Sequence, residues 1–262
     1  MALPHLKAAT AEPLRGEESA QGLTPAKLSR PTTLQRYENG RFQFHGDSIA
    51  VESDLRLMIA GQQEAILSRT PGDDLNLVAG HLFSCSRIRE AGDLANISFN
   101  YRGVARVDVE LAGCSGIRRI YPSPRPVRVA PEMLLEFKER FERRQNLYKN
   151  TGSTHAAALF AEDGELISFG EDVGRHNAFD KAVGRALLEG SLDRVVIAIL
   201  SSRLALELTV KAAVANIPIL CGFSAATSSG IGYAEENNIT LVGRLKSSSF
   251  NVYAHGWRLQ SG

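Results

Sequence analysis

Two clusters of polar residues in the second half of the chain have the composition of a binding site. The first reads Thr151-Gly-Ser-Thr-His155 and the second reads Glu171-Asp-Val-Gly-Arg-His-Asn177. The apolar hairpin expected between them requires only apolar residues and a turn, so the histidines, arginine, acids and hydroxyls at both ends indicate a site on loops. His155 and His176 have the chemistry of general bases or phosphate donors, and they would serve equally well as capping residues.

The candidate nucleophile is Cys114, which lies between two glycines of a small-residue loop and is followed closely by two arginines. Nearby positive charge lowers the pKa of a thiol and increases its thiolate fraction. Cys85 and Cys221 lie in apolar runs and are predicted to be unreactive core residues. An odd count of three cysteines without a close pair argues against a disulfide scaffold and favours a reducing cytoplasm.

Three further loops follow predicted strands and open predicted helices or the C-terminal segment. They are Ser201-Ser-Arg203, Ser224–Gly230 and Lys246–Phe250. Backbone N–H groups at helix starts, together with hydroxyls and an arginine, form anion sites, although serine and threonine at these positions also act simply as N-caps. The chain has neither a phosphate-binding P-loop nor a dinucleotide glycine motif, and it lacks the H-x-E and C-x-x-C patterns of zinc deaminases.

The elements that must hold these loops alternate between strand and helix in the second half. We expect a hairpin of 156–160 and 165–169, strands at 194–200, 218–223 and 240–245, and helices at 177–189, 204–215 and 229–237. This order predicts a layered α/β domain with a largely parallel sheet. A connecting amphipathic helix is expected from Pro131 to Tyr148.

The first half is predicted to be rich in β-strands, so the fold class is α/β (α+β overall). Strands are expected at 48–52, 55–60, 64–69 and 107–111, with a helix at 75–84. Residues 1–34 lack periodicity and are expected to form a loosely ordered tail. The predicted organisation is this tail, a smaller β-rich domain at 35–129 that carries the Cys114 loop, and an α/β domain at 130–262.

Composition excludes several classes of partner. The 262 residues carry 30 Lys and Arg against 29 Asp and Glu, so no global field favours nucleic acid or a membrane surface. The longest aliphatic run, Val195–Leu200, is too short to span a bilayer. The first 20 residues contain no continuous apolar stretch, so a secretory signal is not expected.

Several motifs, in order along the chain, closely resemble those of the FdhD proteins. The close matches are Thr151–Ala158, Glu171–Ala178, Asp180-Lys181 and Phe250–Tyr253; the weaker ones are Val51-Glu52, Arg69–Pro71 and Gly80–Leu82. The resemblance implies a sulfurtransferase that takes sulfur from a cysteine desulfurase as a cysteine persulfide. The sulfur then passes to the molybdenum or tungsten bis-guanine-dinucleotide pterin cofactor before its insertion into formate dehydrogenase.

The same resemblance implies a cytidine-deaminase-like fold for 130–262, without a protein-bound metal, in a cytoplasmic homodimer. It makes Cys114 the catalytic residue. It assigns the guanine-dinucleotide contact to Phe250, Asn251, Val252, Tyr253, Ala254 and His255. With the polar loops, the further expected cofactor-binding residues are Thr151, His155, Arg175, His176, Lys181, Ser201, Arg203, Ser224, Thr227 and Ser228.

One departure from the family pattern leaves alternatives open. FdhD proteins typically carry C-x-x-C in the loop after the strand that matches 107–111, whereas this chain has Cys114 alone, with Ile117 at the second position. One thiolate suffices to carry a persulfide, but a second thiol assists release of the sulfur. The alternatives are a cofactor-binding chaperone without sulfur transfer, and a nucleotide hydrolase or deaminase that uses His155 or His176.

Overall fold

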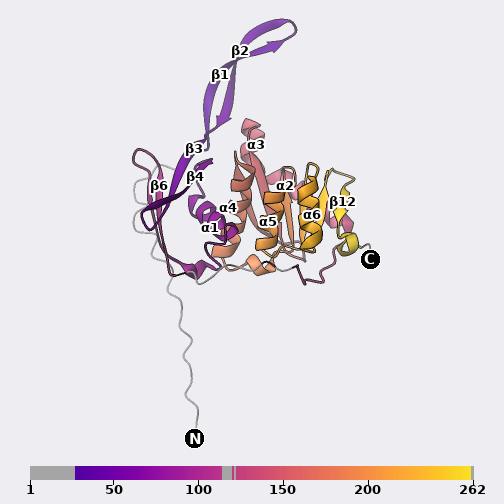
Figure 1. The fold of residues 1–262 in the computed structure, drawn as a ribbon. Coiled ribbons are helices and arrows are strands. Elements are labelled where there is room, and N and C mark those ends of the chain that lie inside the picture. The colour runs from indigo at the N-terminus through magenta and orange to yellow at the C-terminus, as the bar shows by residue number, and fades with distance from the viewer. Residues whose placement is uncertain (1–26, 114–119, 121, 261–262) are drawn as a thin grey trace.

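The largest of the described sheets is a mixed six-stranded sheet that carries the polar loops. The computed structural model describes residues 27–113, 120 and 122–260 (Figure 1). The strand order is β12-β11-β10-β9-β7-β8. The strands are β7 (His155–Phe160), β8 (Leu166–Asp172), β9 (Ile197–Leu200), β10 (Ile219–Gly222), β11 (Thr240–Gly243) and β12 (Asn251–Ala254).

The expectation of a largely parallel sheet is wrong. Only β9, β10 and β11 run parallel to one another. β7 is antiparallel to both β8 and β9 because the β7–β8 hairpin enters the sheet beside β9, and β12 returns antiparallel to β11. The predicted mixed α/β class is confirmed, and the cytidine-deaminase-like architecture stays a prediction.

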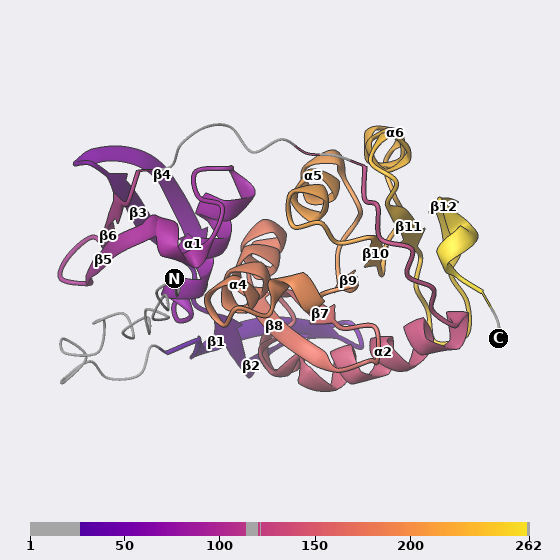
Figure 2. The same ribbon diagram turned by 90° about the horizontal axis from the view of Figure 1, so that it is seen from below.

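Helices cover both faces of this sheet (Figure 2). One face packs against α4 (Arg175–Leu188), α5 (Leu206–Val214) and α6 (Ser228–Glu236), and the other against α2 (Pro131–Arg144). In β7, β9, β10 and β11, alternate residues therefore enter two different apolar clusters, and both sets are buried. Burial on both faces explains why these strands appear in the sequence as continuous aliphatic runs.

A smaller four-stranded sheet has the order β4-β3-β6-β5. Its strands are β3 (Ser53–Ile59), β4 (Gln62–Arg69), β5 (Leu94–Asn100) and β6 (Arg106–Leu111), of which β5 was not predicted. Helix α1 (Asp74–Ser84) lies between this sheet and α4, and both sheets contribute to one apolar cluster. Short 3₁₀ turns occupy 91–93, 192–194 and 256–258. The domain boundary at residue 130 stays a prediction.

Helices α1 and α4 approach each other through two glycines. A Cβ atom at Gly80 would lie 1.9 Å from the carbonyl oxygen of Asp180, and one at Gly184 would lie 1.9 Å from that of Asn76. Because no side chain fits in either place, the two backbones pack in direct contact and the smaller sheet is held close to the larger one.

A β-hairpin extends away from the body (Figure 1). It consists of β1 (Ser29–Glu38) and β2 (Arg41–Ala50). The tail expected up to residue 34 is therefore wrong from Ser29 onward, because these residues pair with β2; residues 1–26 of that tail lie outside the described part.

The helix predicted from Pro131 to Tyr148 is divided in two. It breaks at Gln145, and α3 (Asn146–Thr151) follows. The carboxylate of Glu171 accepts hydrogen bonds from the backbone N–H groups of Leu147 and Tyr148, which gives α3 an N-terminal cap of its own. Among the described helices, none is long and apolar enough to cross a membrane.

Candidate functional site

The predicted polar loops gather along one edge of the six-stranded sheet, here called the loop edge. The carboxyl ends of β9, β10 and β11 lie there because these strands are parallel. His155 and Asn251 begin strands that run antiparallel to them, so both residues lie at the same edge. The start of α4, with Arg175 and His176, follows β8 there. This is the edge at which open α/β sheets bind ligands.

His155 and Ser201, both expected among the site residues, meet at the loop edge. The Ser201 hydroxyl oxygen accepts a hydrogen bond from the backbone N–H of Ala156 at 3.0 Å, and it lies 3.2 Å from Nδ1 of His155. Burial of the half-buried imidazole and the positive charge of Arg175 lower the pKa of His155. The imidazole is therefore neutral near pH 7 and suits hydrogen bonding better than charge pairing.

His176 is also held uncharged. Burial lowers its pKa, and the positive charges of Arg175 and Lys211 lower it further, while Glu207 opposes them. Its Nε2 lies 2.8 Å from the Glu207 carboxylate. Positive charge at this part of the edge is thus supplied by Arg175, whose buried Nε atom has no hydrogen-bond partner among the described residues.

The loops after β9 and β10 combine capping with exposed polar groups. Thr227 is the N-cap of α6, and its hydroxyl oxygen accepts from the backbone N–H of Gly230 at 3.2 Å. This is the capping role that the sequence left open as an alternative. Ser224, Ser228 and Arg203 are exposed. Their hydroxyls and guanidinium face solvent beside two helix starts, an arrangement that favours anions.

Lys181 lies in a buried network, where its ammonium group is fully used. Its Nζ donates to the carbonyl oxygens of Thr70 at 2.9 Å and Glu171 at 3.3 Å, and it pairs with the Asp172 carboxylate at 2.8 Å. An ammonium group has three donors, so none remains for a ligand. Lys181 therefore joins the β4–α1 loop to the end of β8.

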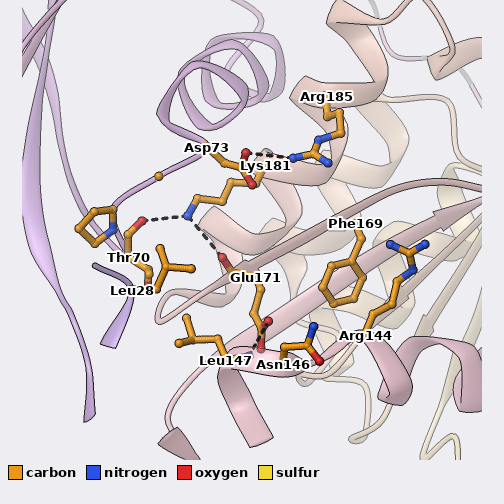
Figure 3. A pocket seen from close by; sticks show the side chains of 12 residues that line it. Leu28, Thr70, Asp73, Arg144, Asn146, Leu147, Phe169, Glu171, Lys181 and Arg185 are labelled. Carbon is orange, nitrogen blue, oxygen red and sulfur yellow. Dashed lines mark hydrogen bonds and ion pairs between the residues drawn. The ribbon is translucent and has the colours of Figure 1, made fainter. Parts of the chain in front are cut away.

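The polar cluster around Thr151 has a comparable structural role. The Thr151 hydroxyl donates to the carbonyl oxygen of Leu147 at 2.8 Å, within α3. Beside this cluster lies a cavity of about 510 Å³ (Figure 3). It lies among the β4–α1 loop, α3, β8 and α4, and its lining includes Arg144, Arg185 and Lys181.

The C-terminal segment begins at the loop edge and leaves it. Phe250 and Asn251 lie there, and β12 then crosses the sheet with Val252 exposed, Tyr253 half-buried and Ala254 buried. His255 lies at the opposite edge, where its carbonyl oxygen accepts from the Thr240 hydroxyl at 2.6 Å. The structure thus brings the first two residues of this predicted segment to the other loops and does not bring His255.

The three cysteines have different surroundings. Cys114 lies outside the described residues. Cys221 is buried, and burial raises the pKa of its thiol, as expected for an unreactive core residue. The same prediction for Cys85 is wrong: α1 ends at Ser84, and Cys85 is exposed at the helix end.

Sequence reasoning missed the surroundings of Cys85. Its sulfur lies 3.8 Å from Nε2 of His81, one turn earlier on α1. The available signal was the spacing of four residues at the end of the helix predicted at 75–84, which places both side chains on one face. In the described part of the chain, no group of three or more His, Cys, Asp or Glu side chains has the geometry of a metal site.

Comparisons with known proteins agree with the fold and the motifs. Residues 50–260 match the model of the FdhD/NarQ family. The chain is 37% identical to the sulfur carrier protein FdhD of Streptomyces avermitilis, over 86% of this chain and 93% of that one. It is 38% identical to the FdhD of Streptomyces coelicolor, over 84% and 91% of the two chains.

The fold is also that of a solved structure. It is the crystal structure of a protein from Desulfotalea psychrophila assigned as a formate dehydrogenase accessory protein, with a TM-score of 0.77 and 23% identity. The match covers 89% of this chain and 100% of that one. Since the family model matches well over half of the sequence, this chain belongs to the FdhD/NarQ family.

Proposed function

We propose that this protein carries sulfur from a cysteine desulfurase to the molybdenum or tungsten bis-guanine-dinucleotide pterin cofactor destined for formate dehydrogenase. The observation that carries the proposal is the loop edge, where polar loops and helix starts lie side by side. A pterin guanine dinucleotide contains pyrophosphate groups, which such an edge suits. The names of the relatives, sulfur carrier proteins, support the sulfur chemistry.

The loop edge offers three kinds of donor to a pyrophosphate. The starts of α4 and α6 carry backbone N–H groups without an intrahelical acceptor, and at α6 the Thr227 hydroxyl takes one of them. The guanidinium of Arg203 is exposed, and Arg175 has an unpaired Nε. The hydroxyls of Ser224 and Ser228 face solvent. Charge-assisted hydrogen bonds from arginine are the strongest of these, so we expect Arg203 to dominate affinity.

Cys114 is the proposed carrier. Its thiolate attacks the terminal sulfur of the desulfurase persulfide, the desulfurase thiolate leaves, and Cys114 becomes the persulfide. With one cysteine in this loop, release to the cofactor would proceed through an external thiol or directly at the metal. The proposed location is the cytoplasm.

The binding half of the proposal is tested with guanosine diphosphate, which stands for one arm of the cofactor. We expect Arg203→Gln to weaken binding by about 10- to 100-fold, the loss of one charged hydrogen bond. Arg36→Gln, on the exposed hairpin, is the matched control and should leave affinity unchanged. Calorimetric affinities within twofold of each other for all three proteins would contradict a phosphate site at the loop edge.

A second candidate function is a cofactor-binding chaperone without sulfur transfer, motivated by the single cysteine of the loop. The two functions differ in the effect of Cys114→Ser. A sulfur carrier loses formate dehydrogenase maturation while cofactor binding persists, and a chaperone retains both. Mass spectrometry after incubation with a desulfurase and cysteine adds a direct readout, a gain of about 32 Da for one sulfur atom on Cys114.

We also propose that the protein acts as a homodimer joined through the β1–β2 hairpin. An isolated two-stranded hairpin is at best marginally stable in water. Tyr37 pairs with Phe42 across the strands, and Phe44 lies two residues further along the same face. Their exposed fractions are 65%, 69% and 79%, so this aromatic face has no cover within the described chain.

A further inference from the structure

Cys85 lies at the end of a chain of polar side chains drawn from three helices. Its sulfur is 3.8 Å from Nε2 of His81, and the other ring nitrogen of His81 is 3.7 Å from the Asp180 carboxylate. Asp180, on α4, is almost fully buried and also pairs with Lys211 of α5. The Ser84 hydroxyl donates to the second carboxylate oxygen of Asp180 at 2.8 Å. The order is thiol, imidazole and buried carboxylate, in which each group orients the one before it.

The electrostatics of this cluster favour an imidazolium–thiolate pair. Burial of the imidazole opposes its protonation, but the hydrogen bonds with Asp180 and Cys85 prevail and raise the pKa of His81 to about 9. The hydrogen bond from His81 lowers the pKa of Cys85 against a smaller effect of burial, and the charge of Lys211 lowers it further.

The other charged groups near the cluster do not cancel this effect. Asp180 alone would raise the pKa of Cys85, but it is paired with both Lys211 and His81. His176 on α4 is held neutral, and Glu207 on α5 lies against His176. Neither group shifts the pKa of Cys85, which responds to His81, Lys211, Asp180 and burial. Cys85 is therefore an exposed residue whose thiol is biased toward the thiolate, the two conditions for a reactive cysteine.

We propose that Cys85 is a second sulfur-accepting site of this protein, which takes sulfane sulfur from a persulfide with His81 as its positioning and proton-donating partner. The inference rests on the proposed sulfur-carrier function and adds a second thiol to it. The Cys85 thiolate attacks the terminal sulfur of a persulfide R–S–SH, forming a new S–S bond as the S–S bond of the donor breaks and R–S⁻ leaves. The leaving thiolate takes the proton of His81, so the products are Cys85–S–SH and R–SH with no external oxidant.

The transfer is tested on the full-length protein with glutathione persulfide as donor, followed by alkylation and peptide-resolved mass spectrometry. We expect the sulfur adduct on Cys85 in wild type and in Cys114→Ser, and its loss in His81→Gln. His45→Gln, which changes an exposed hairpin histidine, is the matched control and should load normally. Cys221 must stay unlabelled in every variant, because its labelling reports unfolding.

A second readout separates positioning from folding. The rate of Cys85 alkylation as a function of pH should have a midpoint below that of a free thiol, and His81→Gln should shift that midpoint upward. No adduct on Cys85 while Cys114 loads overturns this inference and leaves the proposed function standing. Adduct on Cys85 with none on Cys114 supports the inference and removes Cys114 as the carrier. No adduct on either cysteine overturns both this inference and the proposed function. An unshifted alkylation midpoint in His81→Gln overturns the role of His81.

Discussion

At the scale of single residues, the polar clusters around the β7–β8 hairpin divide into two roles. His155, Arg175 and His176 line the loop edge, whereas Asp172 and Lys181 form a buried ion pair that joins separate parts of the chain. Asp172 also accepts hydrogen bonds from the backbone N–H groups of Thr70 and Gly174. Charge-bearing residues in one motif thus serve binding and architecture side by side.

Removing the cation of the buried pair should be costly. Lys181→Met leaves the Asp172 carboxylate buried without its partner, and we expect a loss of about 3–5 kcal/mol in the free energy of unfolding. Lys149→Met, at an exposed lysine of α3, is the matched control and should change stability by less than about 0.5 kcal/mol. Urea denaturation measures both. Equal stability of the two variants would mean that Lys181 is free for a ligand.

The lowered pKa of His155 predicts a pH dependence with a definite sign. Its pKa in the folded state lies below the ordinary 6.5, so the unfolded chain binds the proton first as pH falls. Stability should therefore decrease from about pH 6.5 downward, and His155→Gln should flatten that decrease. Urea midpoints measured across this range test the slope, with His45→Gln as the control; an identical slope in all three proteins would refute the assignment.

At the scale of elements, the contact of α1 with α4 joins the two larger sheets. It depends on Gly80 and Gly184, where an added Cβ would collide with backbone carbonyls. Backbone atoms cannot move aside as the end of a flexible side chain can, so the helices would have to separate. The same contact places His81 and Cys85 beside Asp180.

We expect Gly80→Ala to lower the free energy of unfolding by about 1–3 kcal/mol or more through overpacking. Gly232→Ala in α6 is the matched control, since open space surrounds the position where its Cβ would lie. There the greater helix propensity of alanine should stabilise the protein by roughly 0.5–1 kcal/mol. The expected result in thermal or chemical denaturation is a lower stability for Gly80→Ala and a higher stability for Gly232→Ala than for the wild type. A neutral Gly80→Ala would show that α1 is not in tight contact with α4.

At the scale of the whole molecule, the β1–β2 hairpin extends away from the rest of the described chain (Figure 1). Its strands contain ten residues each, and most of them are exposed. The aromatic face of Tyr37, Phe42 and Phe44 is exposed, and we propose that a second copy of the chain covers it.

Replacing the three aromatic residues with serine should convert the proposed dimer to a monomer. The physical reason is the loss of the large apolar area that aromatic side chains bury at interfaces. Light scattering coupled to size exclusion measures the change in mass. Arg36→Ser with Gln43→Ser, a cross-strand pair on the opposite face of the same hairpin, is the control and should remain dimeric. A mass unaffected by the aromatic substitutions would exclude the hairpin as the interface.

Local sequence patterns were sufficient for most elements of the second half and for the position of its loops. The strands are short aliphatic runs bounded by glycine, serine and proline, so burial and turn chemistry specify them locally. Cys114 and the polar clusters were identified by residue type alone. The antiparallel directions of β7 and β12 within the sheet could not be predicted in this way, because strand direction depends on which strands pair across the chain.

The sequence by itself determined the family, the order of most elements in the second half and the residues rich in chemical function. Only the tertiary structure decided which of those residues meet: it brought His155 to Ser201, engaged Lys181 with Asp172, and carried His255 to the far edge. It also joined Cys85 and His81 to an aspartate nearly a hundred positions away in the chain. Contacts between distant segments depend on helix packing and strand pairing, and no local pattern encodes either one.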